Sequence, residues 1–76
     1  MFPLNILKAG DRLCVCSFAC SADDACRLRE VGCVEGLTGK VLSNQADIIV
    51  QLGETRLGIH RKLAASILVD TQPVPS

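Results

Sequence analysis

The sequence predicts a mainly β fold: a small SH3-like barrel of about five short strands, with an inserted α-helix and a second short helix near the C-terminus. Short alternations of apolar and polar residues recur between turn residues, most clearly over 47–52. Hydrophobic residues make up 49% of the chain but aromatic ones only 3%, so the core must consist of small aliphatic side chains. The length of 76 residues allows one domain, which we expect to span 1–70. Closure into a barrel would remove the edges that an open sheet leaves exposed.

The first predicted strand covers 12–18 and follows a short apolar stretch and a turn within 4–11. Leu13 and Val15 share one face of this strand, because side chains alternate along an extended chain. We expect this aliphatic pair to point into the core.

A helix is expected over about 21–31. Ser21 can cap it by accepting a backbone N–H, and Asp24 stands three residues later, as in a capping box. Gly32 is a natural stop, because glycine adopts the left-handed conformation that ends many helices. Apolar residues recur every three positions and predict one buried stripe: Ala22, Ala25, Leu28 and Val31.

Beyond the helix, Gly36 and Gly39 are expected to mark a turn into a strand over 37–43, which a tight turn at 43–45 ends. The next strand, 47–52, shows the cleanest alternation in the chain. Three of its residues should face the core: Ile48, Val50 and Leu52.

Gly53 and Glu54 predict a two-residue hairpin of type II′, since glycine comes first. The return strand covers 55–59 and should bury Leu57 and Ile59. The remaining segments are expected in the following order: a short helix at about 60–66, a last strand at 67–69 and a flexible tail at 71–76.

Net charge and hydropathy argue against two classes of protein, nucleic-acid binders and membrane-spanning proteins. The formal net charge is zero, and neither a basic face nor stacking aromatics are evident, so we expect no nucleic-acid partner. No apolar run approaches the roughly 20 residues needed to span a bilayer. The start of the chain lacks the features of a secretory signal, so a cytoplasmic location is expected.

Five cysteines stand out: Cys14, Cys16, Cys20, Cys26 and Cys33. Their odd number in a cytosolic chain favours reduced thiols. Cys14 and Cys16 share a strand face with Cα atoms roughly 6.5 Å apart, and Cys20 could fold back as a third ligand. Three thiolates would suit Zn²⁺, Cu⁺ or an iron–sulfur cluster, and weak binding of Fe²⁺ or Zn²⁺ stays open. The missing second cysteine pair argues against a zinc site, so no metal and no cofactor are assigned. Cys26 lies off the helix stripe, and Cys33 is expected to pack into the corner.

Three segments then resemble a known family. The residues LREVGCVEG at 28–36 resemble the L-x-x-[apolar]-G-[apolar]-x-P-G signature of the ferrous iron transport protein A family. The residues LGIHRKLAASILV at 57–69 are similar to its closing motif, which ends A-x-x-I-x-V. The residues LKAGD at 7–11 resemble its opening turn, and the resemblance covers about 4–69.

The resemblance implies a small, non-enzymatic, cytosolic accessory protein of bacterial Fe²⁺ uptake with an SH3-like fold. Its implied partner is the membrane permease that carries a cytosolic GTPase domain, on which it would dock to modulate uptake, peripheral to the inner membrane. Similar domains occur at the C-terminus of metal-dependent transcriptional repressors, so a corepressor-like regulator is one alternative. A metal-binding or redox-responsive protein using Cys14, Cys16 and Cys20 is another, and weak self-association stays open.

Two residues depart from the family pattern. Glu35 stands where proline is usual, which is expected to loosen the corner, and Cys33 takes a usually aliphatic position. The resemblance therefore implies no metal function for the cysteines.

The expected partner surface combines basic and apolar residues from the helix, the corner and the closing segment: Arg27, Leu28, Arg29, Val34, His60, Arg61 and Lys62. His60, the only histidine, is better explained as a cap of the short helix than as a metal ligand, because its basic neighbours repel cations.

Cys33 and His60 could be combined as a nucleophile and base. No third orienting group is evident, so no enzyme activity is expected.

Overall fold

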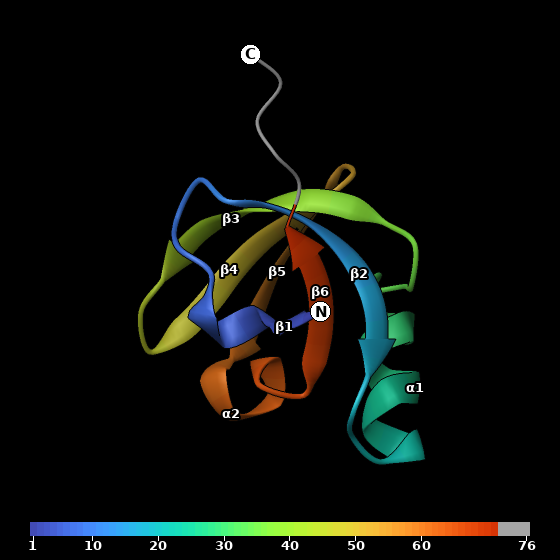
Figure 1. Ribbon diagram of the computed structural model, residues 1–76. Coiled ribbons are helices and arrows are strands. Elements are labelled where there is room, and N and C mark those ends of the chain that lie inside the picture. Colours follow the sequence, from blue (N-terminus) through green and yellow to red (C-terminus); the bar gives the residue numbers. More distant parts are fainter. Residues whose placement is uncertain (72–76) are drawn as a thin grey trace.

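The computed structural model describes residues 1–71 (Figure 1). The elements in chain order are β1 (Phe2–Pro3), the 3-10 helix η1 (Leu4–Ile6), β2 (Arg12–Phe18), α1 (Ala22–Glu30), β3 (Thr38–Asn44), β4 (Asp47–Leu52), β5 (Thr55–His60), α2 (Arg61–Ala64) and β6 (Ile67–Thr71). The strands form one antiparallel sheet in the order β1-β6-β2-β3-β4-β5. None of the helices within residues 1–71 is long and apolar enough to cross a membrane.

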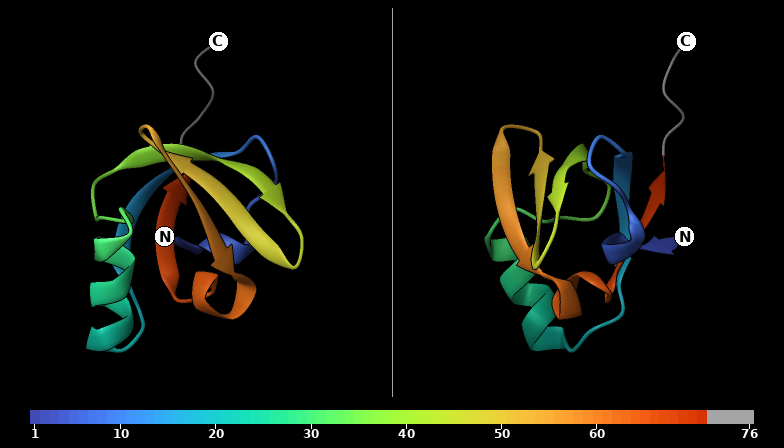
Figure 2. Two further views of the ribbon diagram at one scale, coloured as in Figure 1. Left: turned by 180° about the vertical axis from the view of Figure 1, so that it is seen from behind. Right: turned by 90° about the vertical axis from the view of Figure 1, so that its left-hand side faces the viewer.

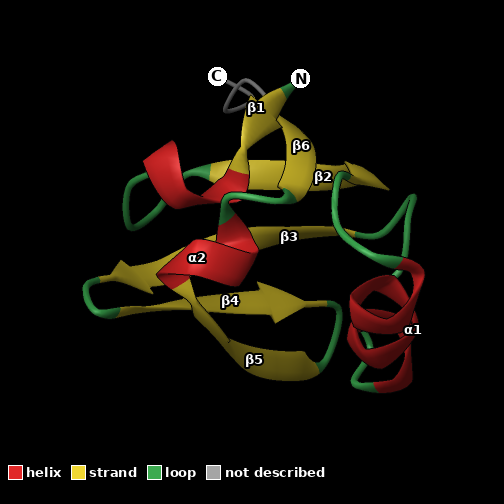
Figure 3. Cartoon of the chain, turned by 90° about the horizontal axis from the view of Figure 1, so that it is seen from below, coloured by secondary structure: helices red, strands yellow, loops and turns green. Residues whose placement is uncertain are grey.

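The mainly β, SH3-like fold is confirmed, but within residues 1–71 the sheet has six strands and does not close. The two edge strands, β1 and β5, do not pair with each other, which leaves a gap between them. The short helix α2 contacts β5 and η1 and lies across this gap, as Figure 3 shows. Side chains from α2 therefore complete the core where backbone pairing stops.

The core consists of small aliphatic side chains and one thiol. Every residue predicted to point inward from the strands is buried, from Leu13 and Val15 to Leu57 and Ile59. Cys33 is buried as predicted, and Ala64 of α2 is fully buried. The sheet bends around this core, helped by irregularities in register at Val15/Ser17 and Val41/Ser43.

Gly39 lies inside β3 rather than in the predicted turn before it. It pairs with Leu13 of β2 and Leu52 of β4. A Cβ at this position would lie 1.9 Å from the backbone oxygen of Gln51. Glycine is required here because β3 and β4 approach each other too closely for any side chain.

Helix α1 begins and ends as predicted. The Ser21 hydroxyl accepts a hydrogen bond from the Asp24 backbone N–H at 3.2 Å. At the other end, Gly32 has a φ of 106°. The Cys33 N–H donates to the Leu28 carbonyl at 2.8 Å, and the Gly32 N–H donates to that of Arg29 at 3.1 Å. These two bonds form a Schellman motif, which satisfies the last carbonyls of the helix.

The predicted stripe of α1 is only half correct. Ala25 and Leu28 are buried, whereas Ala22 is exposed and Val31 is 54% exposed. The helix therefore contacts the core through its middle, and its ends project beyond the core.

The hairpin at Gly53 and Glu54 is confirmed: Gly53 has a φ of 60°, Glu54 has a negative one, and Leu52 pairs with Thr55. The preceding turn, predicted at 43–45, lies at 45–46, because Ser43 and Asn44 both belong to β3. The Asn44 side-chain amide donates to the carbonyls of Asn5 and Leu7 and so ties η1 to the sheet.

The C-terminal segments also differ from the prediction at their ends. Helix α2 is shorter than expected, with His60 as its N-cap. Strand β6 extends to Thr71, which pairs with Leu13, because β2 offers a partner beyond Val69. Residues 72–76 of the predicted tail lie outside the described part of the chain.

Candidate functional site: a groove between α1 and β5

Helix α1 and strand β5 border a groove of about 300 Å³. Figure 2 shows α1 near the edge of the sheet that β5 forms. The groove is lined by Arg27 and Leu28 of α1, by its C-cap Val31, by Arg56, Leu57, Gly58, Ile59 and His60 of β5, and by Leu63 of α2. This set combines two segments far apart in sequence, and we call it the α1–β5 groove.

The floor of the groove is apolar. Leu28, Leu57 and Ile59 are buried core residues that reach the groove from below, and Val31 forms an exposed apolar wall. Gly58 adds no side chain, so the backbone of β5 is bare at this point. A partner that covered this floor would remove apolar surface from water.

The rim of the groove is basic. It carries the guanidinium groups of Arg27 and Arg56 and the exposed ring of His60, and no carboxylate lines the groove. Within residues 1–71, neither arginine forms a salt bridge. Nδ1 of His60 accepts the Lys62 N–H at 3.3 Å, which confirms the capping role and leaves Nε2 as the donor of the neutral ring.

Arg29 does not line the groove, because it is held by groups of its own chain. Its Nε and Nη2 donate to the two carboxylate oxygens of Glu35 at 3.0 and 2.9 Å. Its guanidinium also lies over the Phe18 ring, 5.4 Å from the centroid. Glu35 thus ties the corner to α1, although its replacement of the usual proline was expected to loosen that corner.

This pair predicts a dependence of stability on acid pH. The hydrogen bonds from Arg29 lower the pKa of the Glu35 carboxyl from its ordinary value of 4.5 to about 2. A carboxyl with a lowered pKa stabilises the fold fully above pH 4.5, and this contribution disappears as the pH falls through 2. We expect Glu35→Gln to lower the melting temperature at pH 7 but to match the wild type near pH 2. A difference in melting temperature that is the same at both pH values would contradict this.

Arg61, Lys62 and Val34 also lie outside the groove. Arg61 points to a separate hollow of about 610 Å³ beside η1, where it donates to Asn44 Oδ1 and the Gln45 carbonyl. Lys62 is exposed on α2, and Val34 is 39% exposed in the corner after α1. Of the seven expected partner residues, the groove therefore unites Arg27, Leu28 and His60.

Arg56 is the charged groove residue that the sequence did not reveal. It occupies an outward position in the predicted return strand, where a single charge is indistinguishable from an ordinary exposed one. Only the pairing order, which leaves β5 at an edge beside α1, gives this arginine a role.

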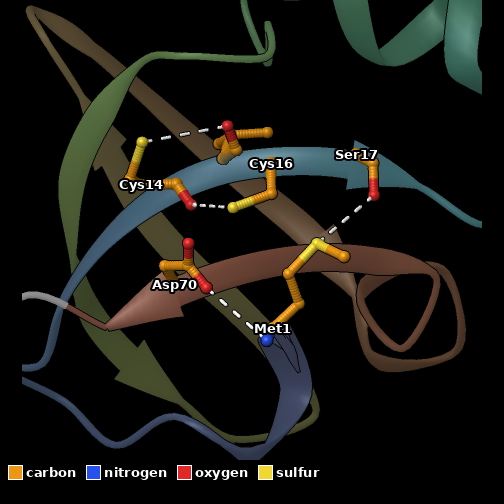
Figure 4. Close-up of polar contacts among 6 residues, drawn as sticks. Met1, Cys14, Cys16, Ser17 and Asp70 are labelled. Atoms are coloured by element: carbon orange, nitrogen blue, oxygen red, sulfur yellow. Dashed lines mark hydrogen bonds and ion pairs between the residues drawn. The ribbon is translucent and has the colours of Figure 1, made fainter.

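All five cysteines are free thiols. The Cys16 thiol donates to the Cys14 carbonyl at 3.5 Å, and the amino terminus of Met1 pairs with Asp70 at 3.5 Å (Figure 4). Burial and the neighbouring Asp70 raise the pKa of Cys16, which favours the thiol over the thiolate. Within residues 1–71, no three His, Cys, Asp or Glu side chains are grouped to hold a metal. Metal binding by Cys14, Cys16 and Cys20 stays a hypothesis.

Two thiols have simple structural explanations. Cys26 is exposed and donates to Glu30 at 3.7 Å. Burial raises the pKa of the Cys33 thiol to about 11, so that it stays protonated at neutral pH. A protonated, buried thiol is a poor nucleophile, which weakens the pairing of Cys33 with His60 as a catalytic unit.

Comparison with known proteins gives the family. A family model described as the FeoA domain matches residues 2–71. The crystal structure of an iron uptake regulatory protein (FeoA) aligns with a TM-score of 0.85 at 27% identity over 93% of this chain and 96% of its own. The FeoA protein from Chlorobium tepidum aligns with a TM-score of 0.85 at 32% identity over 99% of this chain and 74% of its own.

A FeoA-like protein from Clostridium acetobutylicum shares the fold, with a TM-score of 0.84 at 17% identity over 99% of this chain and 91% of its own. No curated protein matches the sequence. The family match nevertheless covers nearly all the described residues, and two of the solved relatives are 27% and 32% identical to this chain where they align. The chain belongs to the FeoA family.

Proposed function

We propose that this chain is a non-enzymatic accessory of ferrous iron transport, which docks through the α1–β5 groove on the cytosolic GTPase domain of a ferrous iron permease and modulates uptake. Membership of the FeoA family supports the role in Fe²⁺ transport. The observation that carries the docking proposal is the groove itself, with its apolar floor and a rim of unpaired arginines.

Such a surface suits a reversible protein contact. Arginine is enriched at the energetically dominant positions of protein interfaces, because one guanidinium combines charge, several donors and an apolar flat face. Leu28 and Leu57 would supply the apolar centre of the contact, with Arg27 and Arg56 at its border. The protonated Cys33 thiol and the capping role of His60 favour binding over catalysis.

Calorimetric titration of the full chain into the isolated cytosolic GTPase domain of the permease tests this proposal. We expect binding at about 10 μM or tighter, the range of many transient complexes. The double variant Arg27→Glu/Arg56→Glu should bind at least roughly tenfold more weakly, because it reverses the charge of the rim. Arg12→Glu is the matched control, since Arg12 is exposed on β2 and lies outside the groove.

Absence of binding by the folded wild-type chain at about 100 μM would overturn the proposal. So would equal weakening by Arg12→Glu, because a general charge effect would then explain the result. The turnover rate of the GTPase domain with and without the chain reports the sign of the modulation.

A further inference from the structure

The outer edge of β5 exposes backbone hydrogen-bonding groups along the groove. In the order of strands within residues 1–71, β5 pairs only with β4. The two-residue hairpin makes Leu52 and Thr55 a hydrogen-bonded pair, and such pairs alternate along antiparallel strands. The N–H groups of Arg56, Gly58 and His60 therefore point away from β4. The same three residues line the groove.

This edge is long and regular, although it carries one charged residue, Arg56. The opposite edge, β1, has only two residues, and one of them is proline. Strand β5 has six residues, contains no proline and pairs with β4 without a shift in register. Natural edge strands are normally short, bulged or interrupted by proline. Strand β5 is thus a regular template beside an apolar floor.

We propose that the α1–β5 groove binds an extended acidic peptide segment of the partner, which adds to β5 as a seventh strand. The peptide backbone would pair with the outward N–H groups of Arg56, Gly58 and His60 and with the carbonyls of Arg56 and Gly58. Its carboxylates would meet Arg27 and Arg56, and an apolar side chain would cover the floor near Leu28. This inference rests on the proposed function and states how the partner would be held.

The charges of the groove favour this occupant over a second copy of the chain. Two β5 edges that paired with each other would bring two Arg56 guanidinium groups to the same interface, and like charges across neighbouring strands are destabilising. An acidic strand would instead place carboxylates beside the guanidinium groups of the rim, so these contacts would be attractive.

Amide NMR titration of the full chain tests the inference. The probe is an acetylated ten-residue peptide of alternating glutamate and valine, and its controls carry lysine or glutamine in place of glutamate. We expect the acidic peptide to shift the amides of Arg56, Gly58 and His60 and to slow their hydrogen exchange. The lysine peptide should leave these amides unchanged. No shift at about 1 mM acidic peptide, a concentration that detects millimolar binding, overturns the inference.

Backbone methylation separates strand addition from side-chain attraction. In an added strand, only every second peptide N–H faces β5. Two peptide series, each methylated on alternate nitrogens, should therefore differ: one should bind like the parent and the other at least roughly tenfold more weakly. Equal affinity of the two series overturns strand addition. Shifts of the same amides when the chain alone is concentrated would show a second copy as the occupant and overturn the acidic partner.

The same spectra separate this inference from the proposed function. If the permease domain binds while the β5 amides stay unchanged, strand addition is overturned, although the accessory role stands. If the acidic peptide binds and the permease domain does not, strand addition stands and the proposed function fails.

Discussion

Replacement of Gly39 by alanine is expected to remove a large part of the free energy of unfolding. The new Cβ would lie 1.9 Å from the Gln51 carbonyl oxygen and 2.9 Å from Leu52 Cδ2. The first of these atoms is backbone in the middle of the sheet, so β3 and β4 would have to separate. We expect a loss of at least about 4 kcal/mol, at the upper end of single substitutions. A domain of 76 residues has only about 4–11 kcal/mol of stability in total.

Gly58→Ala is the matched control, because it makes the same change in the neighbouring part of the sheet. Its Cβ would lie 3.4 Å from Ile49 Cδ1, the end of a side chain that can move. We expect its effect on the free energy of unfolding to stay within about 1 kcal/mol, since alanine also reduces the entropy of the unfolded chain. Urea denaturation followed by circular dichroism measures both variants. Similar stability of the two would contradict the close approach at Gly39.

Gly39 also shows where sequence reasoning stops. A glycine before a run of apolar residues predicts a turn, and nothing adjacent in the sequence reveals that Gln51 lies against it. Local signals were sufficient elsewhere: Ser21 and Gly32 define α1, and Gly53 closes a hairpin. Features that depend on a distant strand were missed, including β1 and the extension of β6 to Thr71.

In the candidate site, too, local sequence indicated some features, whereas others depend on residues that meet only in the folded chain. Residue types indicated a contact surface of basic and apolar side chains, and the structure places Arg27, Leu28 and His60 in one groove. The sequence could not show that the Glu35 carboxylate forms a salt bridge with Arg29, because the two side chains meet only after the chain turns at Gly32. Arg56 needed the strand order, which no local pattern contains.

Leu28→Ala should cost about 3 kcal/mol of the free energy of unfolding, the middle of the range for buried leucines. Leu28 is 3% exposed and is the residue through which α1 joins the core, packed with the buried Cys33 of the Schellman motif. Its loss leaves a cavity that Ala25, the other buried residue of α1, is too small to fill. We expect faster hydrogen exchange of the α1 amides and a matching fall of the urea midpoint.

Val31→Ala provides the contrast, because Val31 comes from the same predicted stripe but is 54% exposed. Its cost should stay below about 0.5 kcal/mol, and exchange in α1 should be unchanged. Since Val31 forms a wall of the groove, its truncation should still weaken binding of the acidic peptide. Leu28→Ala must lower stability and binding together, whereas Val31→Ala must lower binding alone. Equal costs in stability would mean that α1 is anchored along its whole stripe, and the groove would then lack its exposed apolar wall.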